Sequence, residues 1–292
     1  MRIFVTGATG FIGRALVGAA LRRGLHVRCM MRPRSRELDG AARDRAELAP
    51  GSLPEAPGLE LQLAGCDAII HLAALRQERP SHGETFQRVN VEGAERLCAA
   101  AKTARVERLL FASVVGAGGD SASALLASKA EAESIVRRSP LASTIFRVGW
   151  AYGPGDRLMS RLVRAGLRSP IVPVSGDLDV RVQPLTVDDA VGGILNALER
   201  PETHGQAYAV TGSVRFPYRD VLDVVADALP RRPRWVRFGP AMMRVPAPGP
   251  LEGADVDADA LPFARDCGVE LTPLATGIDA LVREIRHHGD EA

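Results

Sequence analysis

The amino-acid sequence predicts an α/β fold, a Rossmann-type doubly wound parallel sheet with a small C-terminal lobe. Three observations predict it: a glycine-rich turn after a short apolar run near the start, apolar runs that alternate with helical segments, and patterning that loosens after residue 150. Strands and helices that alternate at this spacing favour parallel pairing through right-handed crossovers. We expect residues 1–150 to form a dinucleotide-binding core to which 186–212 returns, and 151–185 and 213–292 to form a substrate-covering lobe.

The glycine-rich turn is TGATGFIG at residues 6–13, directly after the apolar run Ile3–Val5. Its three glycines let the backbone turn without a Cβ, let a pyrophosphate approach the main chain, and let the next helix pack on the strand. The helix has an apolar stripe and ends at Arg23 and Gly24, a basic last turn followed by a glycine. Free amides at its N-terminus would face phosphates. The context favours dinucleotide binding over a purely structural turn.

A second strand is predicted at residues 25–31, and its end carries information about the nucleotide. In this fold the end of the second strand meets the adenosine ribose, where a carboxylate would accept the 2′-hydroxyl of NAD. The first acidic residue here is Glu37, whereas Arg32, Arg34 and Ser35 stand at the tip. Because arginine pairs with phosphate in a bidentate way, NADP(H) is favoured. Arg32, and with it Arg34 or Ser35, is predicted to contact the 2′-phosphate; a solvated turn is the alternative.

The remainder of the first half continues the alternation of strands and helices. The run at 68–74 is apolar throughout and bounded by turn residues, which is typical of a parallel strand buried on both faces. Its His71 is interpreted as a core histidine rather than a catalytic base. The other expected segments are a short strand at 47–49, a helix at 59–64, a helix at 84–104, a strand at 108–113, a helix that begins near 121–123, and a strand at 141–148.

The second half is less regular. Thr186 and Asp189 have the spacing of a capping box, and Thr272 followed by Pro273 is a favourable helix start, with threonine as the N-cap. A loop rich in proline and glycine spans 239–253. The expected elements are a helix at 157–167, extended pieces at 171–174 and 180–183, a helix at 186–199, a strand at 207–210, and helices at 218–229 and 274–287.

Composition excludes several classes of function. The chain has 292 residues, 46% of them hydrophobic, and a net charge of +2, which gives no reason to expect nucleic acid or a membrane as partner. Since no apolar run approaches the roughly 18 residues of a membrane span, we expect a cytoplasmic protein. The chain is expected to be a monomer or a homodimer. The four cysteines have no metal-ligand spacing. They are expected to be reduced structural thiols, with no metal site.

Six motifs occur in an order that resembles a known family. They are TGATGFIG, GCDAIIHLAA, VNVEGA, the pair Ser128 and Lys129, YGPGDR and a VDDA helix. The chain resembles the extended and atypical short-chain dehydrogenase/reductases, which are NAD-dependent epimerase/dehydratase-like. It is most similar to the branch of the complex I 39 kDa subunit. The likeness runs from Arg2 to about Ile285 and implies the Rossmann fold, a nicotinamide cofactor and a small-molecule substrate.

The resemblance also implies roles for individual residues. It places Asn90 behind the site, Lys129 on the nicotinamide ribose, and Ser113 where the family keeps its catalytic serine. Arg32 would meet the 2′-phosphate, and the loops at 153–185 and 213–272 would cover the substrate. The remaining cofactor contacts that the likeness implies are Gly7, Thr9, Gly10, Phe11, Ile12 and Gly13 at the pyrophosphate and ribose, and Leu72, Ala73 and Ala74 along the cofactor.

Two positions depart from the family pattern. The family's proton donor is a tyrosine four residues before the lysine, and this chain has Leu125 there. Where relatives carry an aspartate that meets the adenine amine, this chain has Ser52. Tyr152 is the best candidate to replace the missing phenol, with Ser113 behind it, and a packing aromatic is the other interpretation of Tyr152. Lys129 alone could be an ordinary solvated helix residue, but together with the glycine motif it is expected to contact the cofactor.

Without the tyrosine, a reductase lacks the acid that protonates a developing alkoxide, a contribution of about 10²–10⁴-fold. A conjugated acceptor depends less on that acid because its negative charge is delocalised. We therefore expect an NADPH-dependent oxidoreductase acting on a small apolar, conjugated or quinone-like substrate. The alternatives are a non-catalytic NADP(H)-binding redox sensor or scaffold, and a non-redox isomerase or cyclase. The residues expected to line an apolar pocket, or else to be ordinary core, are Phe216, Trp235, Met242 and Met243.

Overall fold

The structure is a computed structural model that describes residues 1–32, 38, 40–117, 123–237 and 256–289. The chain divides into two compact units. The first contains residues 1–148, 191–209 and 262–269, and the second contains 149–190, 210–261 and 270–292. Each unit has its own hydrophobic core.

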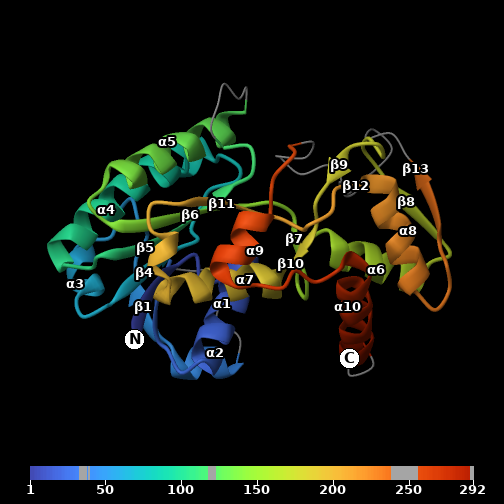
Figure 1. The fold of residues 1–292 in the computed structure, drawn as a ribbon, viewed down its shortest axis with the longest axis horizontal. Coiled ribbons are helices and arrows are strands. Elements are labelled where there is room, and N and C mark those ends of the chain that lie inside the picture. The colour runs from blue at the N-terminus through green and yellow to red at the C-terminus, as the bar shows by residue number, and fades with distance from the viewer. Residues whose placement is uncertain (33–37, 39, 118–122, 238–255, 290–292) are drawn as a thin grey trace. The chain divides into compact units, whose positions relative to one another are not determined.

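The first unit is built on a seven-stranded sheet in the order β11-β6-β5-β4-β1-β2-β3, counted over the described residues (Figure 1). Neighbouring strands from β1 to β6 pair in parallel. This is the Rossmann-type sheet that the alternating pattern predicts. The strands are β1 (Arg2–Thr6), β2 (His26–Met31), β3 (Glu47–Pro50), β4 (Ala68–His71), β5 (Arg108–Val114), β6 (Ala142–Val148) and β11 (Ala207–Val210).

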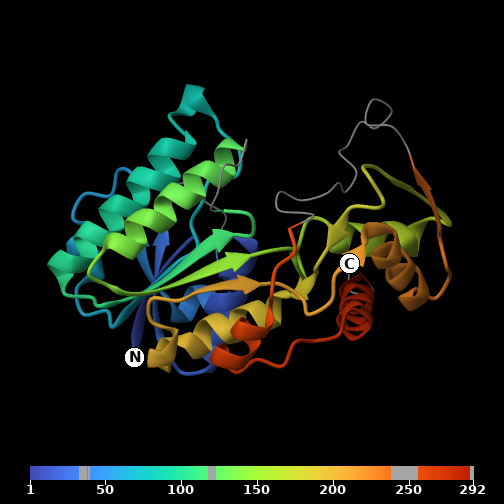
Figure 2. The ribbon, with the colours of Figure 1, turned by 45° about the horizontal axis from the view of Figure 1, so that its top comes forward.

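Helices cover both faces of this sheet. α4 and α5 lie on one face, and α1 and α7 lie on the other (Figure 2). Because both faces are covered, β4 is buried at all four of its residues, as its continuous apolar run predicts. The helices are α1 (Phe11–Arg22), α2 (Gly40–Arg45), α3 (Leu59–Leu63), α4 (Gly93–Ala104), α5 (Ala124–Arg138), α7 (Val187–Asn196) and α9 (Leu261–Cys267), with shorter turns η1 (Pro80–His82), η2 (Gln87–Glu92), η3 (Ala197–Glu199) and η4 (Pro201–Thr203).

Helix boundaries follow local sequence signals in most places. α1 ends at Arg22, and Gly24 follows with φ +77°, so the predicted C-terminal glycine is confirmed. Ser123 caps α5 by accepting the amide of Leu126 (3.4 Å). The prediction of a single α-helix at 84–104 is corrected by the structure. This segment consists of the π-helical turn η2 followed by α4.

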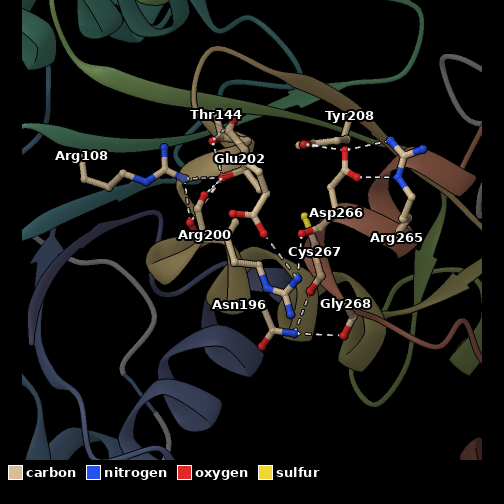
Figure 3. Close-up of polar contacts among 12 residues, drawn as sticks. Arg108, Thr144, Asn196, Arg200, Glu202, Tyr208, Arg265, Asp266, Cys267 and Gly268 are labelled. Atoms are coloured by element: carbon tan, nitrogen blue, oxygen red, sulfur yellow. Dashed lines mark hydrogen bonds and ion pairs between the residues drawn. The ribbon is translucent and has the colours of Figure 1, made fainter.

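Residues late in the chain also belong to the first unit. α9, which the sequence pattern did not predict, is bound to it through Tyr208, whose hydroxyl donates to Asp266 (3.1 Å), and Asn196, which donates to the carbonyl of Cys267 (2.9 Å; Figure 3). At the start of β5, Arg108 donates to the carbonyl of Ala197 at the end of α7 (2.7 Å). A cation at a helix C-terminus is favourable, and this side chain ties η3 to the sheet.

The second unit has small paired strands and three helices among its described residues. Its strand pairs are β7 with β10, β9 with β12 and β8 with β13. The elements are β7 (Ala151–Tyr152), α6 (Met159–Arg168), β8 (Ile171–Val174), β9 (Arg181–Val182), β10 (Leu185–Thr186), β12 (Phe216–Pro217), α8 (Tyr218–Ala228), β13 (Arg234–Arg237) and α10 (Leu274–Gly289).

Two predicted caps in the second unit have mixed outcomes. Thr186 accepts the amide of Asp189 (3.1 Å), which is half of the expected capping box. The carboxylate of Asp189 does not return that bond, because it accepts the amide and the hydroxyl of Thr272 (2.8 and 2.9 Å). The N-cap predicted at Thr272 is therefore wrong: its hydroxyl is used by Asp189, and Pro273 provides the carbonyl that accepts the amide of Gly277 (3.0 Å).

Candidate active site

The glycine-rich turn lies at the carboxyl end of β1, and the three glycines have different reasons to be glycine. Gly7 has φ +73°, and a Cβ there would lie 2.6 Å from the amide nitrogen of Ala73. A Cβ on Gly13 would lie 2.1 Å from the carbonyl oxygen of Gly7. A Cβ on Gly10 would meet only that same oxygen, at 3.2 Å, so the backbone there is open to a ligand. These are the turn, the close packing and the approachable main chain that the sequence analysis expected.

The N-terminus of α1 is electrostatically suited to an anion. Its N-cap, Gly10, has no side-chain capping bond, and the first turn contains no acidic residue. Arg14 lies one turn into the helix and donates to the carbonyl of Thr9 (2.9 Å). Unpaired amides and the positive end of the helix dipole favour phosphate at such a place. The turn therefore fits the pyrophosphate of a dinucleotide.

The end of β4 is bonded to the end of β1. Thr6 shares a hydrogen bond with Nδ1 of His71 (2.7 Å), and its hydroxyl accepts the amide of Ala73 (3.3 Å). His71 is buried and stacks on the ring of Phe111 (5.1 Å between centroids). Burial, and after it the charge of Lys129, lowers the pKa of His71 to about 3. These contacts describe a neutral core histidine, as its apolar surroundings in the sequence indicate.

Arg32 follows β2 at the same edge of the sheet. Its side chain is 62% exposed and forms an ion pair with Glu84 (3.2 Å). An exposed pair of this kind contributes about 0–1 kcal/mol, so the guanidinium can exchange its partner for a phosphate at little cost. Arg34 and Ser35, which were expected beside it, lie outside the described residues.

Lys129 is not the solvated helix residue that was one interpretation of it. It is 3% exposed, its ammonium donates to the carbonyl of Ala112 on β5 (2.7 Å), and it lies 4.6 Å from the centroid of the Phe111 ring. Burial lowers its pKa to about 8, and the charge of Glu133 acts in the opposite direction. A buried amine with a carbonyl and an aromatic face as neighbours is an unusual structural residue and a common kind of site residue.

Ser113 and Asn90 flank the lysine. Ser113 follows Ala112 on β5, and its buried hydroxyl has no hydrogen-bond partner among the described residues. Asn90 accepts the amide of Leu75 (2.8 Å) and donates to the hydroxyl of Ser128 (3.0 Å), so it joins the segment after β4 to α5. The structure thus brings these side chains to the carboxyl ends of β4 and β5.

Leu125 lies one helical turn before Lys129 on α5 and is 6% exposed. Residues four apart on a helix lie on the same face, so this leucine occupies the position from which a tyrosine would share its proton with the lysine. Ser52, the second departure, uses its carbonyl to accept the amide of Glu55 (2.9 Å).

Tyr152 belongs to the second unit and is 1% exposed. Its hydroxyl donates to the carbonyl of Leu274 (3.5 Å), and a Cβ on Gly277 would lie 2.1 Å from that hydroxyl. Burial, and after it the charge of Asp189, raises the pKa of the phenol. This environment matches the packing interpretation of Tyr152.

Of the residues considered for an apolar pocket, Phe216 and Trp235 pack against the core of the second unit. Met242 and Met243 lie outside the described residues.

Two groups at this edge of the sheet were not predicted from the sequence. One is Thr6, whose hydroxyl holds the segment after β4. The other is Glu133, which is 3% exposed and pairs with Arg147 of β6 (2.6 Å). An acid four residues after Lys129 was a visible signal for Glu133, but its partner depends on how α5 packs on β6.

Three findings bear on other kinds of site. Within the described residues, no cluster of three or more His, Cys, Asp and Glu side chains is placed to hold a metal ion. None of the described helices combines the length and apolarity needed to cross a membrane. All four cysteines are free and buried.

Comparison with known proteins gives a consistent result. The sequence matches the NAD dependent epimerase/dehydratase family over residues 3–211. It is 30% identical to the ceramide reductase of Caulobacter vibrioides over 88% of this chain and 77% of that protein. It is 27% identical to the mitochondrial NADH dehydrogenase [ubiquinone] 1 alpha subcomplex subunit 9 of Dictyostelium discoideum, over 76% of this chain and 62% of that protein. The solved structure of MoeE5 with UDP-glucuronic acid and NAD is similar, with a TM-score of 0.78 and 25% sequence identity, over 99% of this chain and 100% of that chain.

Proposed function

Because the chain belongs to the NAD dependent epimerase/dehydratase family of nicotinamide-dependent proteins, we propose that it is an NADPH-dependent oxidoreductase. Its proposed substrate is a small apolar molecule, conjugated or quinone-like. The observation that supports this proposal is the arrangement on α5: Lys129 is buried, and the residue one helical turn before it, where the resemblance would place a proton donor, is Leu125.

The proposed cofactor contacts follow from the carboxyl edge of the sheet. The pyrophosphate would lie against the open backbone at Gly10 and the amides that begin α1, where no acidic side chain opposes it. The 2′-phosphate would replace Glu84 as the partner of Arg32. Lys129 would donate to the ribose next to the nicotinamide.

The proposed chemistry uses few protein groups. The bound cofactor supplies a hydride. The ammonium of Lys129 would stabilise negative charge that develops on the substrate oxygen, and the unpartnered hydroxyl of Ser113 would donate to that oxygen. Since Leu125 has no proton to give, the final protonation would come from water, which suits an acceptor with delocalised charge. The covering role of 151–185 and 213–292 stays a prediction.

Names of relatives support both this proposal and one alternative. Likeness to a ceramide reductase supports reduction of an apolar substrate. Likeness to a subunit of NADH dehydrogenase, together with Leu125, supports a protein that binds NADP(H) without turnover, as a redox sensor or scaffold.

One experiment distinguishes the oxidoreductase from the non-catalytic sensor or scaffold. NADPH binding is titrated by calorimetry, and NADPH oxidation is followed with a panel of quinones and enones. We expect binding and turnover, both reduced at least tenfold in Lys129→Met. Lys102→Met is the matched control, because Lys102 is exposed and is the only other lysine in the chain. Binding without turnover would favour the sensor or scaffold, and no binding of either NADPH or NADH would refute both.

A further inference from the structure

Glu133, a buried carboxylate one helical turn beyond Lys129, forms an ion pair with Arg147, whose side chain is 33% exposed. The Glu133 side chain is 4% exposed, and its two oxygens accept from Nε (2.9 Å) and Nη2 (2.6 Å) of Arg147. A bidentate pair of this kind fixes both side chains in orientation. Because a buried carboxylate without a partner is costly, the buried Glu133 needs Arg147, and the pair ties α5 to β6.

The same pair is connected to the other residues of the site through the sheet. Arg147 is the register partner of Ser113 across β5 and β6. Lys129 bonds to Ala112, the residue before Ser113. α5 is therefore attached to this end of the sheet at two points one turn apart, by Lys129 to β5 and by Glu133 to β6.

We infer that Glu133, held by Arg147, is a positioning residue for Lys129: it fixes α5 on β6 one turn beyond the lysine and so directs the ammonium at the carboxyl end of β5. The inference rests on the proposed function only in giving Lys129 a role toward the cofactor. A buried cation with carbonyl and ring contacts alone has no opposite charge to offset its desolvation. The carboxylate of Glu133 supplies that charge from the same helix.

The other charged groups around Lys129 do not supply the negative charge that offsets the desolvation of its ammonium. His71, from β4, is neutral at ordinary pH because burial lowers its pKa to about 3. Arg147, from β6, is a cation. Arg137 is a second, weaker partner of Glu133 (3.8 Å) and is 44% exposed, so solvent screens it. Among the charges named here, Glu133 alone favours the protonated lysine, and its charge raises the pKa of Lys129 against the effect of burial.

The chain offers a direct test, because Lys102 and Lys129 are its only lysines. Protein labelled with ¹³C and ¹⁵N in lysine gives two side-chain signals, which are titrated by NMR. In the wild type we expect Lys129 to titrate near 8. In Glu133→Gln, the Lys129 midpoint should fall by about one unit or more. In Arg137→Ala, which removes only the exposed partner, it should not move.

A second measurement addresses positioning. Glu133→Asp keeps the charge but shortens the side chain, so we expect the Lys129 midpoint to stay while the dissociation constant for NADPH rises several-fold. NADPH affinity of the wild type should weaken as pH rises through the Lys129 midpoint, and this weakening should begin at lower pH in Glu133→Gln. An unchanged Lys129 midpoint in a folded Glu133→Gln variant would overturn the inference. If the wild type binds no NADPH, the proposed function fails, and the NMR titration still decides the role of Glu133.

Discussion

At the scale of single residues, the relation between Leu125 and Lys129 was predictable from the sequence, because four residues separate them on a regular helix. What the sequence left open was whether Lys129 is buried, and that depends on how α5 packs on β5. The pairing of Glu133 with Arg147 was beyond prediction for the same reason. Their contact exists only once α5 packs on β6.

Leu125→Tyr tests whether the site has kept the geometry of a carbonyl reductase. A phenol one turn before the ammonium of Lys129 would regain a proton donor whose pKa the cation lowers. We expect the rate with simple ketones to rise by roughly 10²–10⁴-fold, measured as NADPH oxidation. Leu126→Tyr, one position along the same helix, is the control. No gain in Leu125→Tyr would indicate a more extensively changed pocket.

Arg32 and Glu84 test the choice of nucleotide, with effects of opposite sign. Arg32→Ala should weaken NADPH by about tenfold or more while leaving NADH nearly unchanged, since it removes a charge-assisted bond to phosphate. Glu84→Gln should tighten NADPH, because the carboxylate that now holds Arg32 would otherwise repel the phosphate. Calorimetric titration of both nucleotides provides the comparison. An unchanged ratio of the two affinities in Arg32→Ala would remove the preference for NADP(H).

Tyr152 is expected to serve packing. Tyr152→Phe should leave the rate of NADPH oxidation unchanged and lower the free energy of unfolding by about 0.5–1.5 kcal/mol, the contribution of one buried hydrogen bond. Steady-state kinetics and urea unfolding measure the two quantities. A loss of rate without loss of stability would instead support Tyr152 as a proton donor.

At the scale of elements, periodicity was a reliable guide to long helices and to the buried strands of the first unit. It failed for π-helical η2, since a single π-turn within a helix is too short to change the apolar pattern recognisably, and for the short α9. Periodicity also gave little information about the two-residue strands of the second unit, such as β7 and β10. Such strands are set by long-range pairing rather than by local sequence, so no local pattern marks them.

The start of α6 shows that a motif residue can be explained by an element rather than by catalysis. Asp156 of YGPGDR is buried, and its carboxylate accepts the amides of Leu158 (2.7 Å), Met159 (2.6 Å) and Ser160 (3.0 Å). Asp156→Ala should therefore lower the free energy of unfolding by about 1–3 kcal/mol. Asp156→Asn, which keeps an accepting oxygen, should lose less. Equal losses in the two variants would show that the hydrogen bonds to the amides are unimportant.

At the scale of the whole molecule, the order of the seven strands places the described residues of the first unit that are proposed to contact the cofactor at one edge of the sheet. Parallel strands all end at the same edge. Residues as distant in sequence as Gly10, Arg32, His71 and Lys129 therefore meet there. This gathering follows from the alternating pattern alone. The neutrality of His71 does not, because it depends on layers that cover both faces of the sheet.

The burial of His71 predicts how the free energy of unfolding depends on pH. Unfolding returns His71 to its ordinary pKa of 6.5, whereas in the folded protein the pKa is about 3. Below pH 6.5 the unfolded chain binds a proton that the folded protein does not, so stability falls on acidification until the folded pKa is reached. Between about pH 7 and about pH 4.5, this group should lower the free energy of unfolding by about 2–3 kcal/mol. Urea unfolding of the wild type and of His71→Asn at both pH values isolates the effect. The variant should lose less stability than the wild type, and equal losses would mean that His71 is protonated within the folded sheet.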